Sequence, residues 1–212
     1  MGGLPVVLRK VVLATRNRGK LGEFRRLLAP RGCEVIDLDG AGIRRDHEET
    51  GDTFEANARL KALAYSHDTP LPVLADDSGL EVAALGGRPG VHSARYAGAG
   101  ADDEQRIRLL LEELRGAPAP RAARFVCALA LAQSGRLLLE VRGKCLGEIA
   151  FEPRGRRGFG YDPIFVFPEL GRTFAELSAE EKDRVSHRAR AVEALWAAAG
   201  GIDTQRGTRL IE

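Results

Sequence analysis

The stretch Lys10–Gly32, KVVLATRNRGKLGEFRRLLAPRG, decides the fold. It begins with an unbroken apolar run, Val11–Ala14, which predicts a buried strand. From Lys20 onward, apolar residues recur at the spacing of one helix face. Pro30 and Gly32 end that pattern. The stretch therefore predicts a strand, a loop and a helix in succession.

Strands are expected at several further places. CEVID (33–37) and Ile164–Phe167 are expected to be short strands, and LPVLA (71–75) is apolar without alternation, which is typical of a strand buried on both faces. Two longer segments, 123–133 and 136–150, are separated by the turn SGR and predict an antiparallel hairpin. The fold class is therefore expected to be α/β, with a mixed β-sheet flanked by helices.

Three further helices are expected. The first covers about Thr53–Ser66, and the second follows a capping box formed by Asp102 and Gln105. The third follows a second cap of the same kind at Ser178, and one continuous helix is expected to bury Val185, Ala189, Val192 and Trp196. The glycine-rich segment 84–101 predicts a loop. No long linker interrupts the chain, so residues 1–212 predict a single domain of two lobes.

Composition restricts the class of protein. The 212 residues are 44% hydrophobic, which is enough for a sizeable core, and the net charge is +2 without a basic tract, which argues against a nucleic-acid polymer as partner. Three distant cysteines indicate reduced thiols and a cytoplasmic protein. The N-terminal segment MGGLPVVLRK is too short for a signal peptide. The longest apolar run, Phe125–Ala132, is far shorter than the roughly 20 residues of a membrane helix.

The loop of the first segment, TRNRGK, joins the expected strand to the expected helix. Free backbone N–H groups and the positive end of the helix dipole attract phosphate at such a junction. Arg16, Arg18 and Lys20 add full positive charges. The loop is not a Walker A motif, because it lacks that motif's first glycine and final Ser or Thr. A solvated basic turn capped by Asn17 is the alternative explanation.

Two groups of acidic residues are candidate metal ligands. Glu48 and Glu49 precede a glycine turn and a helix, where acids commonly stabilise the helix dipole, but a carboxylate there could also hold Mg²⁺. Asp76 and Asp77 are expected at the carboxyl end of a buried strand, where open α/β sheets bind ligands. Alternation points the two side chains in opposite directions, so only one can face a ligand. The alternative is that both stabilise a turn with Ser78 and Gly79.

The last polar cluster is divided between GFGYDP (158–163) and EEKDRVSHRAR (180–190). Glycines on both sides of Phe159 allow a planar ring to approach the backbone, and the aromatic faces could stack on a base. A hydrophobic anchor in an irregular turn is the alternative. Within the second segment, His187 lies about 200° from Val185 on a helical wheel and is expected to face away from the core. The alternative for these basic residues is an exposed helix face.

Five motifs occur in an order that resembles the inosine triphosphate pyrophosphatases, enzymes that remove deaminated purine nucleotides. They are TRNRGK, EETGDTFEANARLKA, LADDSGLEV with LGGRPGVHSARYAG, GFGYDPIF and ELSAEEKDRVSHRARA. The resemblance extends from Val11 to about Leu195. It implies an elongated fold of two lobes with an active-site cleft between them, and a homodimer. It also implies Mg²⁺-dependent hydrolysis of ITP, dITP and XTP to the monophosphate and pyrophosphate, which keeps these nucleotides out of DNA and RNA.

The resemblance also implies roles for individual residues. Asp77 would be the catalytic acid or base and, together with Glu48, a metal ligand. Ser78 would contact the substrate. The triphosphate would contact Thr15, Arg16, Asn17, Arg18, Gly19 and Lys20. The nucleotide and its base would contact Phe159, Gly160, Tyr161, Asp162, Lys182, His187 and Arg188. Arg16 departs from the family, since many relatives have a small residue there. Two alternatives remain, a related pyrophosphatase with another base preference and a non-catalytic nucleotide-binding regulator.

Overall fold

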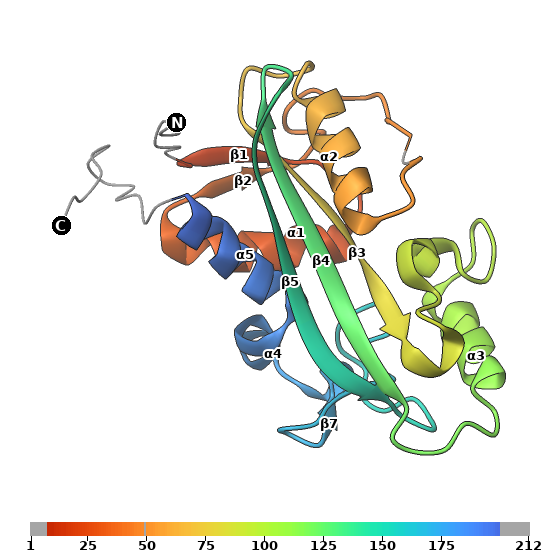
Figure 1. The fold of residues 1–212 in the computed structure, drawn as a ribbon. Helices are drawn as coiled ribbons and strands as arrows, with labels where there is room; N and C mark the ends of the chain where they lie inside the picture. The colour runs from red at the N-terminus through yellow and green to blue at the C-terminus, as the bar shows by residue number, and fades with distance from the viewer. Residues whose placement is uncertain (1–7, 49, 200–212) are drawn as a thin grey trace. The chain divides into compact units, whose positions relative to one another are not determined.

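The computed structural model describes residues 8–48 and 50–199. Within these residues, seven strands form one sheet in the order β2-β1-β3-β4-β5-β6-β7 (Figure 1). The strands are β1 Lys10–Leu13, β2 Glu34–Ile36, β3 Val73–Val82, β4 Ala122–Gln133, β5 Arg136–Ile149, β6 Phe165–Phe167 and β7 Arg172–Thr173. Strand β1 pairs in parallel with β2 and β3, whereas β6 pairs antiparallel with β5 and β7. The expected mixed sheet is confirmed.

The helices follow the predicted order. They are α1 Arg18–Leu28, α2 Phe54–Tyr65, α3 Asp103–Glu113, α4 Ala179–Val185 and α5 His187–Ala198. Short 3₁₀ helices are η1 Ala29–Arg31, η2 Ala83–Leu85, η3 Gly90–Arg95 and η4 Phe174–Glu176. The predicted capping boxes of Asp102 with Gln105 and of Ser178 with Glu181 are both present. Polar side chains at these helix starts satisfy backbone N–H groups that have no partner within the helix.

The chain divides into two compact units. Unit 1 contains the described residues up to Asp77, Cys127–Gly143 and the described residues from Arg188 onward. Unit 2 contains Ser78–Val126 and Lys144–His187. Strands β3, β4 and β5 therefore each pass from one unit into the other.

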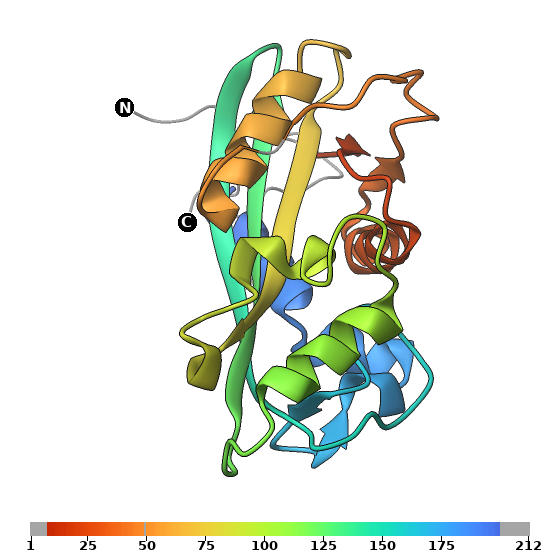
Figure 2. The ribbon, with the colours of Figure 1, turned by 90° about the vertical axis from the view of Figure 1, so that its right-hand side faces the viewer.

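A large buried cluster of unit 1 lies on one face of its strands. Alternate residues of β1, β3 and β4 form a buried cluster with α1 and α5, as the period of two in a strand requires. The cluster includes Val11, Leu13, Leu74, Cys127, Leu129, Leu131, Phe24, Leu28, Val192 and Leu195. Figure 2 shows α2 in front of these strands and α5, in blue, behind them. Helices thus cover both faces of the unit 1 strands.

The core of unit 2 is rich in aromatic rings. The ring centroid of Phe165 lies 4.4 Å from that of Phe125 and 4.9 Å from that of Phe174. Ile107, Leu110 and Leu114 of the α3 region belong to the same buried cluster, as their helical spacing predicts. This core supports the loop that carries the GFGYDP motif, because Tyr161 and Ile164 are members of it.

Three expectations about the elements were wrong. Strand β3 does not end at the two aspartates but continues to Val82, since Leu80 and Val82 are themselves fully buried core residues. No turn therefore forms at Ser78 and Gly79. The segment 84–101 is not all loop, because it contains η3 and the last part of η2. The continuous last helix is two helices, since Ser186 has an extended backbone, with φ −69° and ψ 159°.

Candidate functional site

The loop between β1 and α1 has the geometry of an anion-binding helix start. Asn17 caps α1 by accepting a hydrogen bond from the Lys20 N–H at 3.0 Å, and the Thr15 hydroxyl accepts one from the Asn17 N–H at 3.2 Å. The first turn of α1 contains no acidic residue, and Arg18 in it is exposed. No acidic side chain in that turn therefore balances the positive end of the helix dipole.

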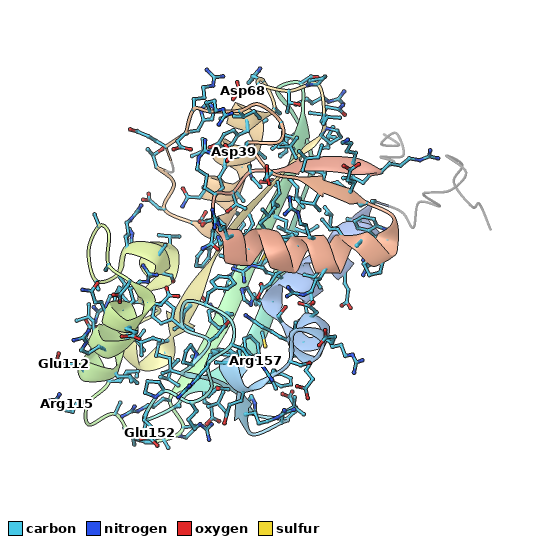
Figure 3. The ribbon with its side chains drawn as sticks, turned by 180° about the vertical axis from the view of Figure 1, so that it is seen from behind. Asp39, Asp68, Glu112, Arg115, Glu152 and Arg157 are labelled. Atoms are coloured by element: carbon cyan, nitrogen blue, oxygen red, sulfur yellow. The ribbon has the colours of Figure 1, made fainter. Side chains whose placement is uncertain are left out.

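Arg16 turns toward the loop that precedes α2. Its guanidinium donates to Asp46 at 2.6 Å, to Asp39 at 3.2 Å and to the Arg44 carbonyl at 3.0 Å. The hydrogen bond from Arg16 lowers the pKa of the Asp46 carboxyl below its ordinary value. Asp39, labelled in Figure 3, lies on the same loop. In this structure the positive charge of Arg16 is compensated by two carboxylates.

Asp76 lies at the centre of a buried ionic cluster in unit 1. Its carboxylate is 0% exposed, 2.6 Å from the Lys20 ammonium and 3.9 Å from the Arg188 guanidinium. Arg188 also donates to Glu23 of α1 at 2.7 Å. Burial alone would raise the pKa of Asp76, but the charges of Lys20 and Arg188 hold that pKa well below its usual range. Asp76 is therefore an anion that holds two of the predicted substrate-binding cations.

Asp77 has different neighbours, as the alternation of β3 predicts. Its carboxylate is 7% exposed and accepts a hydrogen bond from the Asn57 side-chain amide of α2 at 3.1 Å. Asn57 is itself 2% exposed. The same amide accepts a hydrogen bond from the Gly51 N–H at 2.7 Å. Asp77 is thus connected through Asn57 to the turn that precedes α2.

Two carboxylates of unit 1 are the candidate metal ligands. Glu48 is exposed, whereas Asp77 is buried, and Glu49 lies outside the described residues. Within 8–48 and 50–199, no group of three or more His, Cys, Asp or Glu side chains is placed to hold a metal ion. Mg²⁺ keeps several waters and uses only one or two protein carboxylates together with substrate phosphates. The donor chemistry of Glu48 and Asp77 therefore fits Mg²⁺.

In unit 2, two carboxylates hold the GFGYDP loop. Asp162 accepts a hydrogen bond from the Phe159 N–H at 3.0 Å and forms a buried ion pair with Lys182. Asp103, in the first turn of α3, accepts one from the Gly160 N–H at 2.6 Å. The hydroxyl of the buried Tyr161 donates to the Ser93 carbonyl at 3.0 Å. The predicted residues Phe159, Gly160, Asp162 and Lys182 do come together.

His187 does not face away from the core. It is 2% exposed and its ring stacks on Phe125, with centroids 4.7 Å apart and an angle of 15° between the ring planes. The helical-wheel prediction was wrong because Ser186 interrupts the helix between Val185 and His187. Lys182 and Arg188 are also buried, so the alternative of an exposed helix face is wrong as well. Burial of three cationic or titratable side chains costs free energy and needs specific partners.

A cavity of about 930 Å³ lies within unit 2, between α3 and residues 153–163. Phe159 and Gly160 line it, together with Ile107 and Leu111 of α3. Figure 3 labels three of its charged lining residues: Glu112 and Arg115 at the end of α3, and Arg157 on the facing loop. The predicted base-contacting residue Phe159 thus lies at the edge of a cavity large enough for a small molecule.

The residues that sequence reasoning missed are supporting ones. Asn57, Glu23 and Asp103 were not candidate site residues, yet each contacts a predicted site residue. Asn57 and Glu23 are polar residues on the buried sides of their helices. A polar residue at a position where the helical pattern expects an apolar one is the sequence signal that would have identified both residues. Asp103 gave no such signal, because an acid in a first helix turn is ordinary.

The sheet and the β1–α1 junction place the chain in the class of α/β proteins with an anion-attracting helix start after the first strand. The Ham1 family model matches residues 11–198. The dITP/XTP pyrophosphatase of Geobacillus kaustophilus is 54% identical over 189 residues, which cover 89% of this chain and 93% of that protein. The dITP/XTP pyrophosphatase of Bacillus subtilis is 48% identical over 191 residues, which cover 90% of this chain and 96% of that protein. The chain belongs to the Ham1 family.

Solved structures agree with this assignment. The structure of a HAM1 protein from Coxiella burnetii superposes with a TM-score of 0.81 at 44% identity, covering 91% of this chain and 99% of that one. A nucleoside-triphosphatase, dITP/XTP pyrophosphatase, from Mycobacterium abscessus superposes with a TM-score of 0.70 at 46% identity, covering 88% of this chain and 98% of that one. The resemblance inferred from the five motifs is confirmed.

Proposed function

We propose that this chain hydrolyses the deaminated purine nucleotides dITP, ITP and XTP to the monophosphate and pyrophosphate. The observation that carries the proposal is 48–54% identity, over about nine tenths of the chain, to proteins named dITP/XTP pyrophosphatases. The site residues support it chemically. A triphosphate brings about four negative charges, which cations, helix N–H groups and a metal ion must offset.

In the proposed mechanism, Thr15–Lys20 bind the triphosphate at the start of α1. Arg18 and the N–H groups of the first turn contribute directly, and Lys20 is held in place by Asp76. Arg16 contributes less than its charge suggests, because Asp39 and Asp46 compensate it. Removal of Arg16 would therefore loosen its loop more than it would weaken phosphate binding.

Glu48 and Asp77 would hold Mg²⁺, which supplies positive charge at the phosphate oxygens when bound. Asp77 would also orient or deprotonate the water that attacks the α-phosphorus, with pyrophosphate as the leaving group. Ser78 would contact the substrate. The hydrogen bond from the Asn57 amide fixes the position of the Asp77 carboxylate for these tasks.

Isotope labelling tests the site of attack. Turnover in ¹⁸O-labelled water should place one labelled oxygen in the nucleoside monophosphate, because the water oxygen bonds to the α-phosphorus. Label found in pyrophosphate alone would refute attack at the α-phosphorus while leaving the nucleotide specificity untouched.

For the base, we propose stacking on Phe159, with Gly160, Tyr161, Asp162, Lys182 and His187 of unit 2 forming the surrounding pocket, and with Arg188 as a further substrate-binding residue. Hypoxanthine and xanthine present an oxygen at the purine 6-position, whereas adenine presents an amino group. Donors in the pocket would favour the oxygen, because an unpaired buried polar group is costly.

A substrate panel separates this proposal from a pyrophosphatase with another base preference. ITP, dITP, XTP, GTP, ATP, dUTP and dTTP would be compared under one Mg²⁺ concentration. We expect the highest kcat/KM for dITP, ITP and XTP. A higher kcat/KM for dUTP or dTTP would assign the chain to a different nucleotide class.

Two further properties belong to the proposal. Among the described residues, no helix is long and apolar enough to cross a membrane. Cys33, Cys127 and Cys145 are free and buried, which suits a reducing compartment, and we propose the cytoplasm. We also propose a homodimer, for which multi-angle light scattering of the purified protein should give twice the 22.9 kDa chain mass.

A further inference from the structure

Asn57 makes two hydrogen bonds that fix the orientation of its side chain. The Nδ2 group donates to Asp77 Oδ2 at 3.1 Å, and Oδ1 accepts from the Gly51 N–H at 2.7 Å. A flipped amide would place its oxygen against a carboxylate and its NH₂ group against an N–H group. The amide can therefore bridge Asp77 and Gly51 in one orientation only.

Gly51 is packed so closely against α2 that a larger residue does not fit. A Cβ atom at this position would lie 2.8 Å from Asn57 Oδ1 and 2.8 Å from the Ala56 Cβ. Gly51 lies three residues after Glu48, so the turn at Gly51 packs directly against Asn57. A single buried side chain thus joins Asp77 of β3, helix α2 and this turn, and all three belong to unit 1.

We propose that Asn57 is a positioning residue that holds the Asp77 carboxylate and the turn after Glu48 in the mutual arrangement that metal binding requires. The inference rests on the proposed function, since Asp77 and Glu48 are the metal ligands proposed there.

Two substitutions separate the two ends of the amide. Asn57→Ala removes both hydrogen bonds. Asn57→Asp has the same shape and still accepts from the Gly51 N–H, but it replaces the NH₂ donor by an oxygen and adds a negative charge beside Asp77. We expect both variants to lose about 10- to 100-fold in kcat, the usual cost of removing a group that orients a metal ligand.

Thr53→Ala is the matched control. Thr53 caps α2 by accepting a hydrogen bond from the Ala56 N–H at 3.1 Å, so its removal destabilises the helix that carries Asn57 without touching Asp77. We expect kcat of this variant to stay within a factor of about two of the unsubstituted protein, although its melting temperature should fall.

Metal binding gives a readout that does not need turnover. The affinity for Mn²⁺ alone, measured by electron paramagnetic resonance, should fall about 10-fold in Asn57→Ala and remain unchanged in Thr53→Ala. Wild-type Mn²⁺ affinity and kcat in a folded Asn57→Ala protein would overturn the inference. Wild-type kcat in Asn57→Asp would overturn the part that concerns Asp77.

The experiment also distinguishes the inference from the proposed function. Failure of the unsubstituted protein to hydrolyse dITP, ITP or XTP would refute the proposed function, whereas Mn²⁺ affinity would still test Asn57. Circular dichroism and thermal unfolding establish whether each variant is folded. If Asn57→Ala is unfolded, the isosteric Asn57→Asp still tests whether turnover tolerates a carboxylate in place of the amide donor to Asp77.

Discussion

Asp76 and Asp77 are neighbours in sequence, but their carboxylates contact different elements of the structure. Asp76 is buried between Lys20 and Arg188, and the Cys127 thiol donates to it at 3.1 Å. Asp77 instead receives a neutral donor from Asn57. The prediction that the two side chains point in opposite directions agrees with these contacts. Asp76 is the counter-ion of Lys20 and of the buried Arg188, and Asp77 remains the proposed catalytic residue.

Asp77→Asn should abolish most turnover without abolishing nucleotide binding. The substitution preserves shape but removes the charge needed to activate water and to hold a metal ion, so we expect kcat to fall by about 10²–10⁴-fold. Steady-state kinetics and equilibrium binding of dITP measure the two effects separately. Binding without pyrophosphate release by the unsubstituted protein would favour the regulator alternative.

Asp76→Asn should affect stability as well as activity. It leaves Lys20 and the buried Arg188 without their shared buried anion, a loss that typically costs about 3–5 kcal/mol of unfolding free energy. Urea denaturation measures this. Glu34→Gln is the control, because the pair of Glu34 with Lys10 is solvent-exposed and should contribute no more than about 1 kcal/mol. Equal effects of the two substitutions would contradict the central role of Asp76.

At the scale of the elements, local sequence signals predicted the first residues of helices and strands better than their last residues. The caps at Asp102 and Ser178 and the helix at 53–66 were predicted closely, because capping is chemistry between residues three positions apart. The hairpin at Ser134 and Gly135 was also predicted, because its turn is formed by residues adjacent in sequence. Both residues have the positive φ of such a turn.

The errors arose where tertiary packing overrides a local pattern. The pair of aspartates in β3 resembles the end of a strand, but apolar residues beyond it are buried in the core of unit 2. The break at Ser186 has no glycine or proline to mark it. Two-residue β7 is too short to give a periodic signal. The site residues came from family resemblance, while their supporting contacts became visible only in the structure.

Ser178→Ala should destabilise the protein by about 1 kcal/mol, since it removes the side-chain cap of α4. The Ser178 hydroxyl accepts from the Glu181 N–H at 3.1 Å, and α4 carries Lys182. Urea denaturation would measure the loss. Arg184→Gln, at an exposed position of the same helix, serves as the control and should change stability by less than about 0.5 kcal/mol.

At the scale of the whole molecule, the division into units does not follow the order of the chain. The boundaries fall between Asp77 and Ser78, Val126 and Cys127, Gly143 and Lys144, and His187 and Arg188. The first three lie inside β3, β4 and β5. Each unit therefore depends on strands whose other halves belong to its neighbour, which is why we propose that residues 1–212 fold as one domain.

One cooperative unfolding transition is the expected consequence. If β3, β4 and β5 lost their pairing in one unit, the pairing of the same strands in the other unit would be disturbed as well. The two units should therefore unfold in one step, and the calorimetric and van't Hoff enthalpies of unfolding should agree. Differential scanning calorimetry in the absence of nucleotide provides the comparison. Two resolved transitions, or a calorimetric enthalpy well above the van't Hoff value, would show that the units unfold independently.

The interleaved boundaries also limit how this protein could have evolved. A unit that occupies one continuous stretch of gene can be duplicated, lost or exchanged by a single recombination event. Here no single cut separates the two units, because the chain passes between them four times. Neither unit can therefore be exchanged as one continuous segment, and a redesign of substrate preference is better directed at point substitutions and at loops such as the GFGYDP segment.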